Sequence, residues 1–547
     1  MLLHVLKPLF YVDEMNDNEI VITGFIDEED NELTVEDLLN VDKPTKYYCY
    51  GFQPTIAYIE KWWKQHKYKV CKFKGKIGYH GHTANGTLLC YDHVKANHNS
   101  APSTLTFKAY YFGREVHFLD IDKWIDRLSI FHEEPGERKE IFAVLHNIEK
   151  LIMPEYEKSF NASKAPGALA KVSRAIITDI GKFKSEDRNE FLHEVRSCNS
   201  SGYNYIAEPN KVYTKPLYYY DVKSMYPFMV LNKMYPKTNR PPKRYEGFKN
   251  TNGLAIYHIN SLVAALKPRH FPTLFSQQEQ QERMGLPDNI NINWQANYDI
   301  INGWITSIDL QMLYRDYDIS ELDIDISYCY QAQEIGKDIF GDKLQIYFDR
   351  KEAATDPYER KAYKGLINKF VGSLSMKQGR NHYKIDDLSN PTRTERIPES
   401  ESNLSPLDLG AFTTAYARQY ITELALLAGY ENVACISTDA IVIKDPTPIL
   451  KYVGNKMGDL SLDRVMHNTR WWRINTYEWQ DENGNWKAKV AGLPSYKYQH
   501  DKTFFVIPKM GYDIGTNQYY KFYQTFNLEE DYLCQNEIDY TSVGIEL

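Results

Sequence analysis

Two strand-like segments far apart in the sequence each bring an aspartate to their end, and this pairing constrains the fold more than any other feature. The first, "PLYYYDV", reads as a buried strand, yet it ends beside Asp221 and is soon followed by Pro227, which cannot continue a ladder. The second, "ENVACISTDAIVIKDP", reads as two short apolar strands with Asp439 at or beside their turn. Only a fold that sets these segments side by side explains both placements.

Two adjacent carboxylates of this kind would hold divalent cations. Two metal ions about 4 Å apart stabilise the attacking and the leaving oxygen of an in-line phosphoryl displacement, and carboxylates with substrate phosphates and water suffice as magnesium ligands. An aspartate at a strand end is, taken singly, more often a cap or turn residue. The metal site is therefore a hypothesis that depends on both residues.

A basic helical face fits the same chemistry. After Pro357 the sequence predicts a helix on which Arg360, Lys364, Asn368 and Gly372 recur every four residues and so share one slowly drifting face. Lys364 and Arg360 could hold the phosphates of a nucleoside triphosphate. A lysine-rich helix face is, by itself, more often simply solvated.

Length, charge and cysteine content bound the remaining alternatives. A chain of 547 residues exceeds what one core usually holds, so two or more domains are expected. The formal net charge of −8 means that any nucleic-acid binding is local. Seven cysteines without CxxC spacing favour a reduced compartment over disulfides or a zinc site. With no signal peptide and no long apolar run, we expect a cytoplasmic protein without a membrane partner.

The order and content of these segments resemble the motifs of family B DNA polymerases, and most closely the protein-primed, phi-twenty-nine-like branch of small phages, linear plasmids and adenoviruses. The family's D-x-x-S-L-Y-P appears as "DVKSMYP", its K-x-x-x-N-S-x-Y-G as "KGLINKFVG", and its Y-x-D-T-D-S as "CISTDA". The resemblance covers roughly residues 190 to 500. It implies an α+β or α/β multidomain right-hand fold of palm, fingers and thumb, with an N-terminal RNase H-like exonuclease-type domain.

The resemblance also assigns roles to particular residues. Asp221 and Asp439, with the backbone carbonyl of Val222, would bind two Mg²⁺ ions, with Mn²⁺ as a substitute. Tyr226 would be the steric gate that selects deoxynucleotides, and Lys364 would bind the incoming dNTP. The other implied dNTP-binding residues are Asn368, Gly372, Arg360 and Lys351, and the implied primer or DNA contacts are Tyr477, Arg473 and Thr438.

Three departures from the family pattern bear on activity. In the third motif Ser437 replaces the first aspartate and Ala440 the final serine, so Asp439 would have to suffice. In the second motif Lys369 and Val371 stand where serine and tyrosine are usual. In the thumb segment Asn475 replaces a primer-contacting lysine, and Arg473 is a candidate substitute.

The N-terminal domain departs further and is predicted to lack proofreading. The exonuclease pattern needs D-x-E on the first strand, and "YVDEM" keeps Asp13 but has Met15 for the glutamate. The second segment offers Pro54 and Thr55 without a carboxylate, and the late helix has Asn147. A site that needs four carboxylates for two cations would retain one.

A basic and aromatic stretch in the same domain suggests a different use. Seven lysines between Lys61 and Lys76 alternate with tryptophan, tyrosine and phenylalanine, a composition that can track a backbone and stack bases. Lys69, Lys72 and Lys74 are its candidate DNA contacts. A solvated helix followed by a basic edge strand is an equally good interpretation.

The expected domains follow the motifs. They are a degenerate exonuclease-like domain (1–165), a first palm part (166–295), an insertion resembling the priming-protein-contacting region (296–340), fingers (341–373), an insertion resembling the strand-displacement arm (374–405), a second palm part (406–468) and a thumb (469–547). The expected partners are template and primer DNA, dNTPs and a terminal priming protein. Two alternatives remain open: a template-independent or RNA-using nucleotidyltransferase on the same fold, and a non-catalytic DNA-binding replication scaffold.

Overall fold

The structure is a computed structural model. It describes residues 2–16, 18–67, 69–73, 76–82, 88–94, 104–109, 114–121, 130–131, 137–156, 190–192, 194–195, 198, 202–237, 241–273, 298–341, 343–355, 357–374, 382–385, 394–397, 407–473, 475–490, 493, 497–513 and 518–528. The expected boundary near residue 165 lies outside these ranges. Among the described helices, none is long and apolar enough to cross a membrane.

The N-terminal domain is built on a sheet whose central strands run parallel. Strands β1 (Leu2–Asp13), β4 (Thr45–Cys49) and β9 (Arg114–Asp120) pair in parallel. Helix α2 (Phe52–Lys67) covers one face with α1 (Val35–Leu39), and α3 (Glu137–Tyr156) covers the other. Every residue of β4 is buried, as expected for a parallel strand covered on both faces. The remaining strands are β2 (Glu19–Ile26), β3 (Glu32–Leu33), β5 (Lys69–Phe73), β6 (Lys76–His82), β7 (Leu88–Val94) and β8 (Thr104–Ala109).

The central sheet holds both aspartate-bearing segments, "PLYYYDV" and "ENVACISTDAIVIKDP". Its strand order is β10-β21-β22-β12-β23-β24-β25, with β11 paired to β23. The bounds are β10 (Asn204–Ile206), β11 (Val212–Tyr213), β12 (Leu217–Val222), β21 (Val433–Ser437), β22 (Ala440–Ile443), β23 (Leu460–Arg473), β24 (Thr476–Gln480) and β25 (Trp486–Val490). Strand β12 thus lies between the hairpin β21–β22 and the long strand β23, which spans the expected palm–thumb boundary at 468.

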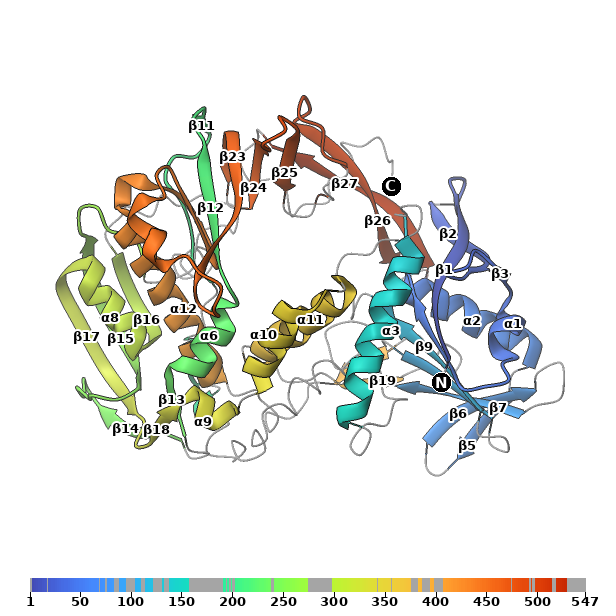
Figure 1. Ribbon diagram of the computed structural model, residues 1–547. Coiled ribbons are helices and arrows are strands. Elements are labelled where there is room, and N and C mark those ends of the chain that lie inside the picture. Colours follow the sequence, from blue (N-terminus) through green and yellow to red (C-terminus); the bar gives the residue numbers. More distant parts are fainter. Residues whose placement is uncertain are drawn as a thin grey trace.

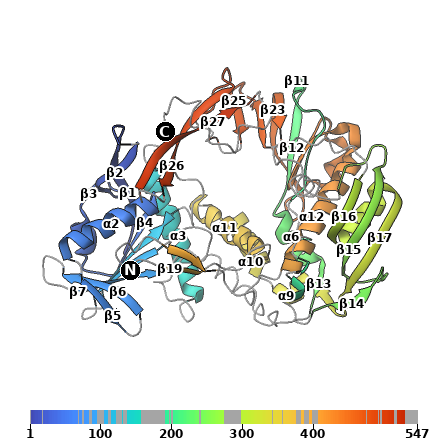
Figure 2. The same ribbon diagram turned by 180° about the vertical axis from the view of Figure 1, so that it is seen from behind.

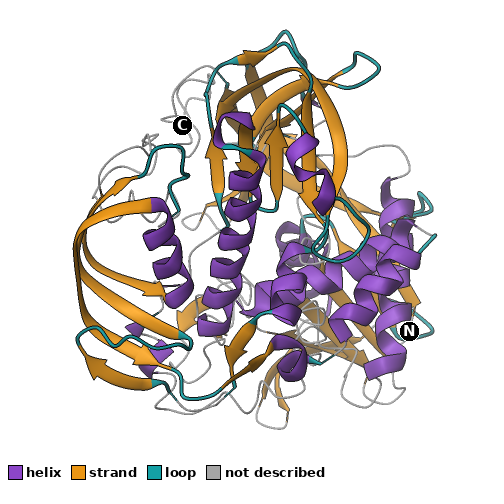
Figure 3. Ribbon diagram, turned by 60° about the vertical axis from the view of Figure 1, so that its left-hand side comes forward, coloured by secondary structure: helices purple, strands orange, loops and turns teal. Residues whose placement is uncertain are grey.

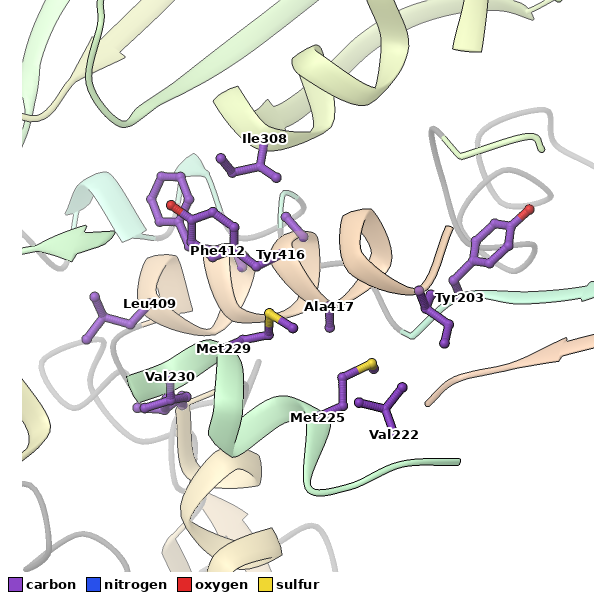
Figure 4. Packing of buried hydrophobic residues seen from close by; sticks show 14 of the residues in the cluster. Tyr203, Val222, Met225, Met229, Val230, Ile308, Leu409, Phe412, Tyr416 and Ala417 are labelled. Atoms are coloured by element: carbon purple, nitrogen blue, oxygen red, sulfur yellow. The ribbon is translucent and has the colours of Figure 1, made fainter. Parts of the chain in front are cut away.

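Two helices cover one face of this sheet. Helix α12 (Leu407–Ala428) is buried along most of its surface, as a central helix must be, and it ends at Gly429, whose φ of +93° favours glycine. Helix α6 (Met225–Asn232) follows β12 directly. Figure 4 shows Met225, Met229 and Ala417 packed between the two helices within the largest core. This core fixes where β12 ends.

A second, four-stranded sheet lies beside the central one. Its order is β14-β17-β15-β16, from β14 (Lys243–Glu246), β15 (Ala255–Leu266), β16 (Tyr298–Thr306) and β17 (Tyr317–Cys329), with α8 (Ser307–Asp316) packed on it. Figure 3 shows this sheet as a curved layer with helices on one side. The expected insertion 296–340 is therefore too short: its strands complete a sheet that begins at Lys243, because β15 pairs with both β16 and β17.

The segment after this sheet is mostly helical, and the helix predicted after Pro357 is present. Short strands β13 (Met234–Pro236) and β18 (Gln333–Ile335) pair ahead of α9 (Gly336–Phe340). Then come α10 (Lys343–Ala353) and α11 (Pro357–Leu374), which pack as a helix pair. In the expected second insertion, the described part is the hairpin β19 (His382–Ile385) and β20 (Thr394–Ile397).

The last described strands close the molecule into a ring of contacts. The hairpin β26 (Phe504–Asp513) and β27 (Gln518–Asn527) extends from the central sheet to the N-terminal domain, where Tyr520 pairs with Glu19 of β2. On the other side, α11 packs against α3. Figures 1 and 2 show the hairpin as a bridge between the two halves, with α10 and α11 below it.

Candidate active site

The two aspartates that end the strand-like segments are neighbours. Strands β12 and β22 are antiparallel, and Asp221 is the Cα partner of Ala440, the residue after Asp439. The backbone N–H of Val222 donates to the carbonyl of Asp439 at 2.8 Å. The end of β12 is thereby tied to the β21–β22 turn, and both carboxylates stand at the same place on the sheet.

Strand alternation explains why a buried strand carries a carboxylate. The side chains of Tyr220 and Val222 join the core beneath α6 and α12, whereas Tyr219 belongs to the cluster on the opposite face. Because successive side chains point to opposite faces, Asp221 shares the face of Tyr219 and not that of the helices. The strand is packed on both faces up to Tyr220, and the carboxylate follows near its end, on the face away from the helices.

The carboxylates repel one another and are partly withdrawn from water. Burial, followed by the charges of Asp439 and Asp463, raises the pKa of Asp221 to about 7, against the lowering effect of Lys364 and Lys351. Burial likewise raises the pKa of Asp439. Such a cluster of oxygen ligands suits a hard divalent cation, whose charge would remove the repulsion. The residues present therefore fit a metal ion.

Sequence reasoning missed Asp463. It lies on β23, two residues from Ser461, which is the Cα partner of Asp221. Asp463 lies at a β-bulge, between Leu462 and Arg464, and its charge adds to burial and to Asp439 in raising the pKa of Asp221. The pattern "LSLD" at the start of a strand was the available signal, but it needs the pairing of β12 with β23 to acquire meaning.

The cations expected on the helical segment face these carboxylates. Lys364 is exposed on α11, and its charge acts on both Asp221 and Asp439. Lys351 of α10 donates to the Ser224 hydroxyl at 3.1 Å, next to the end of β12. Asn368 and Gly372 lie further along α11 and are exposed. The structure thus brings Lys364 and Lys351 to the aspartates.

Glu352 is a second residue that the sequence did not indicate. Its carboxylate lies 3.0 Å from Lys351, 3.5 Å from Arg360 and 4.0 Å from Lys223. Burial opposes its ionisation, but Lys351, Arg360 and Lys223 together lower its pKa. Glu352 therefore remains ionised and occupies the cationic cluster.

Tyr226 lies beside the turn that carries Asp439. Burial and the charge of Asp439 raise the pKa of its hydroxyl. A Cβ added to Gly202 would lie 2.7 Å from both the Tyr226 hydroxyl and Cγ2 of Thr438. Gly202 therefore lets the backbone approach these two side chains closely. Thr438 itself has a φ of +59°, and its N–H donates to the Tyr203 carbonyl at 2.7 Å.

Tyr477 and Arg473, two of the expected primer or DNA contacts, lie on β24 and at the end of β23. Tyr477 is buried and packs with Tyr219, Cys435 and Ala440, so the curled sheet folds β24 over the face that carries Asp221. Arg473 ends β23 and pairs with Thr476, and its side chain lies outside the described part. Asn475 occupies the intervening turn, with a φ of +59°.

Ala440, the other departure in the third motif, has a packing reason. It is fully buried, faces the cluster of Tyr219 and Tyr477, and is paired with Asp221. A serine hydroxyl there would need a hydrogen-bond partner in an apolar cluster. The alanine at this position therefore belongs to the core that supports β12.

The N-terminal candidates lie apart from this site. Lys69 and Lys72 are on β5, where their side chains are outside the described part, and Lys74 is outside it altogether. Asp13 lies at the far end of β1, paired with Glu19 of the hairpin. This placement corrects its alignment with an exonuclease carboxylate, because β1 stops pairing with β4 at Leu6, seven residues earlier, roughly 20 Å along a strand.

The central sheet is curled and antiparallel and carries paired carboxylates. A helix pair presents cations to these carboxylates, and the hairpin β26–β27 bridges over both. This arrangement is the right-hand architecture of nucleic-acid polymerases. The comparisons with known proteins specify the family. Residues 144–422 match the family model "DNA polymerase type B, organellar and viral", and the chain belongs to this family.

Individual relatives agree with this assignment. The DNA polymerase of Streptococcus phage Cp-1 is 26% identical over 228 residues, which are 41% of this chain and 38% of that one. The chain thus matches well under half the length of this relative. Phi29 DNA polymerase, solved with primer-template DNA and incoming nucleotides, has a TM-score of 0.66 at 16% identity, covering 96% of this chain and 99% of the other. Its complex with primer-template DNA alone has a TM-score of 0.67 at 15% identity. The predicted multidomain right-hand fold is confirmed.

Proposed function

We propose that this protein is a DNA-directed DNA polymerase of a phage, virus or linear plasmid. The convergence of Asp221 and Asp439 at one point of the sheet carries the proposal. Membership of the type B family and the likeness to a polymerase solved with primer, template and nucleotide support it. The central sheet with α6 and α12 would be the palm, α10 and α11 the fingers, and β24–β27 the thumb.

The proposed reaction is attack of a primer hydroxyl on the α-phosphorus of a dNTP. The new bond joins the primer oxygen to phosphorus, and the α–β phosphoanhydride bond breaks to release pyrophosphate. Asp221 and Asp439 would hold divalent ions, proposed as two Mg²⁺, which would supply charge stabilisation to both oxygens. Lys364, with Lys351 and Arg360, would bind the triphosphate, and Tyr226 would exclude a ribose 2′-hydroxyl.

Primer extension with the wild type and the Asp439→Asn variant tests this proposal. The wild type is expected to extend primed DNA with dNTPs and Mg²⁺, and Asp439→Asn to lose about 100-fold or more, because a lost carboxylate removes charge stabilisation in the transition state. A scaffold protein would incorporate nothing in either form. Equal incorporation without template would favour the template-independent alternative.

We also propose that the N-terminal domain lacks proofreading activity. Asp13 is too far along β1 to share a cation with residues near Thr55. The residue that directly follows the β1–β4 pairing is Lys7, which is buried, and burial with the nearby Arg138 lowers its pKa to about 8. A cation here is incompatible with metal binding at the same place.

Degradation of single-stranded DNA with Mg²⁺ or Mn²⁺ tests this absence. We expect no cleavage above that of a mock preparation. Cleavage by the wild type that disappears in Asp13→Ala or Lys7→Ala would contradict the proposal, since a contaminating nuclease would act equally in all three preparations.

Protein priming is the proposed mode of initiation. Its support is the likeness to phi29 DNA polymerase and the four-stranded sheet inserted between the segments of Asp221 and Lys364. The protein would be incubated with a candidate terminal protein and labelled dATP. Label attached covalently to a serine, threonine or tyrosine of that partner is expected. Extension of DNA primers without any such label would contradict protein priming.

A further inference from the structure

Lys489 lies on the face of the central sheet that carries the catalytic carboxylates. It stands on β25 as the Cα partner of Tyr477 on β24. Paired residues of neighbouring strands project to the same side. Tyr477 packs on that side against Tyr219, Cys435 and Ala440. Lys489 therefore projects toward the face of Asp221 and Asp439, although it is distant in sequence from both.

The charge of Lys489 reaches this site. It interacts electrostatically with Asp439 and with Cys435, whose neighbour on the same face is Tyr477. Its side chain is exposed, so the ammonium remains free to bind a solvated anion. Its neighbour on the same face, Lys487, is paired with Trp479 and acts instead on Asp481, in the β24–β25 turn.

The cations around the two aspartates come from two sides. Lys351 acts on Asp221, Lys489 acts on Asp439, and Lys364 acts on both. Lys364 and Lys351 belong to the helix pair, whereas Lys489 belongs to the strand layer on the other side. Two phosphate-bearing substrates must approach one cluster of carboxylates. Each needs its own positive charge to offset the repulsion.

We propose that Lys489 binds the terminal phosphodiester of the primer strand and so positions its 3′ end at Asp439. This inference rests on the proposed polymerase function and deepens it by assigning a cation to the primer. Lys364, on the helix pair, then serves the triphosphate. The division predicts that the two lysines affect different substrates.

The test compares Lys489→Ala with Lys487→Ala, a matched control on the same strand and the same face. Primer-template affinity is measured without dNTP at several salt concentrations. Lys489→Ala is expected to weaken affinity about fivefold to tenfold and to reduce the salt slope by about one ion. Lys487→Ala is expected to change affinity less than about twofold. Lys489→Arg, which keeps the charge, should retain most of the affinity.

Steady-state kinetics give the second measurement. Lys489→Ala should raise the KM for primer-template and leave the KM for dNTP unchanged. Equal affinity and salt slope in Lys489→Ala and Lys487→Ala would overturn the inference, and so would an effect confined to the KM for dNTP. Circular dichroism and Tm of each variant would exclude misfolding as the cause.

The Asp439→Asn variant separates this inference from the function on which it rests. It should bind primer-template as well as the wild type while it fails to incorporate nucleotide. If Asp439→Asn incorporates normally, the proposed catalytic role of Asp439 fails, whatever Lys489 does. If Asp439→Asn is inactive and Lys489→Ala binds like Lys487→Ala, only the inference about Lys489 fails.

Discussion

Glu352 is an anion held inside the cluster of cations proposed to bind the triphosphate. Lys351 and Arg360 cannot contact this carboxylate and nucleotide phosphates with full effect at once. Glu352→Gln is therefore expected to lower the KM for dNTP by about twofold to fivefold, the effect of one weak ion pair. Asp349→Asn is the control, because Asp349 lies on the same helix, is exposed and contacts Gln345. A higher KM in Glu352→Gln would show that Glu352 instead holds Lys351 in a productive position.

Asp221 links the acidic cluster to stability. Its pKa of about 7 lies above that of an unfolded aspartate, so between about pH 4 and pH 7 the folded protein holds a proton that the unfolded chain has released. Its contribution to stability is thus lost as the pH rises from about 4 to about 7. Without divalent metal, Asp221→Asn is expected to raise the Tm by about a few degrees at pH 8 and by less at pH 5.5. Thermal unfolding at both pH values checks this.

Added metal provides the control for that prediction. A divalent ion between Asp221 and Asp439 would relieve the repulsion in the wild type but would bind the variant less well. The Tm difference should therefore shrink or reverse with saturating Mg²⁺. A variant that is less stable than the wild type at pH 8 without metal would contradict the repulsive arrangement.

Among individual residues, the sequence predicted those that stand in a recognisable local motif. Asp221, Asp439 and Lys364 could be singled out because each stands in a short pattern, and the structure brings them together. Asp463 and Lys489 could not, because their roles depend on which strands are neighbours. Which strands lie side by side is a property of the whole sheet, and the alternation within a single strand does not specify it.

At the scale of an element, two cations on α11, Lys364 and Arg360, are expected to differ in their effect on dNTP binding. Lys364 acts on the carboxylates of Asp221 and Asp439, whereas Arg360, one turn earlier on α11, is 3.5 Å from Glu352. Lys364→Ala is expected to raise the KM for dNTP by about tenfold or more, because a charge-assisted phosphate contact is lost. Arg360→Ala should have a smaller effect. Steady-state kinetics measure both, and a larger effect of Arg360→Ala would reverse the assignment.

Elements were predicted best where a periodic pattern is bounded by proline or glycine. Helix α11 begins at Pro357 and α12 ends before Gly429, as the sequence indicates. The expected insertion boundary at 296 was wrong because β15 precedes it yet pairs with β16 and β17 beyond it. A sheet assembled from strands on both sides of a proposed boundary cannot be divided by composition alone.

At the scale of the whole molecule, the contact between β2 and β27 closes the ring. Glu19 and Tyr520 are Cα partners, and the N–H of Lys521 donates to the Asn18 carbonyl at 3.0 Å. Partners in antiparallel strands lie at about 4.5–5.5 Å between Cα atoms, which suits a disulfide. Glu19→Cys with Tyr520→Cys is expected to form a cross-link under oxidising conditions. Non-reducing electrophoresis detects this cross-link.

The cross-link tests whether DNA passes through the ring. Enzyme oxidised after binding primed circular DNA should remain bound at high salt, whereas enzyme oxidised beforehand should bind linear but not circular DNA. The single variants Glu19→Cys and Tyr520→Cys are the controls. Release of the cross-linked enzyme from circular DNA at the same salt concentration as these controls would show that DNA lies outside the ring.

The same contact places the first and last described strands in one sheet, and this has a consequence for synthesis of the chain. The edge of β2 emerges from the ribosome about five hundred residues before the strand that pairs with it. Apart from Phe25 and Ile26, which pair with β3, it is an open strand edge throughout translation, and other polypeptides can pair with it. Nascent or truncated chains are therefore candidates for strand exchange with a neighbouring copy at this edge, and a chaperone that shields β2 would favour correct closure.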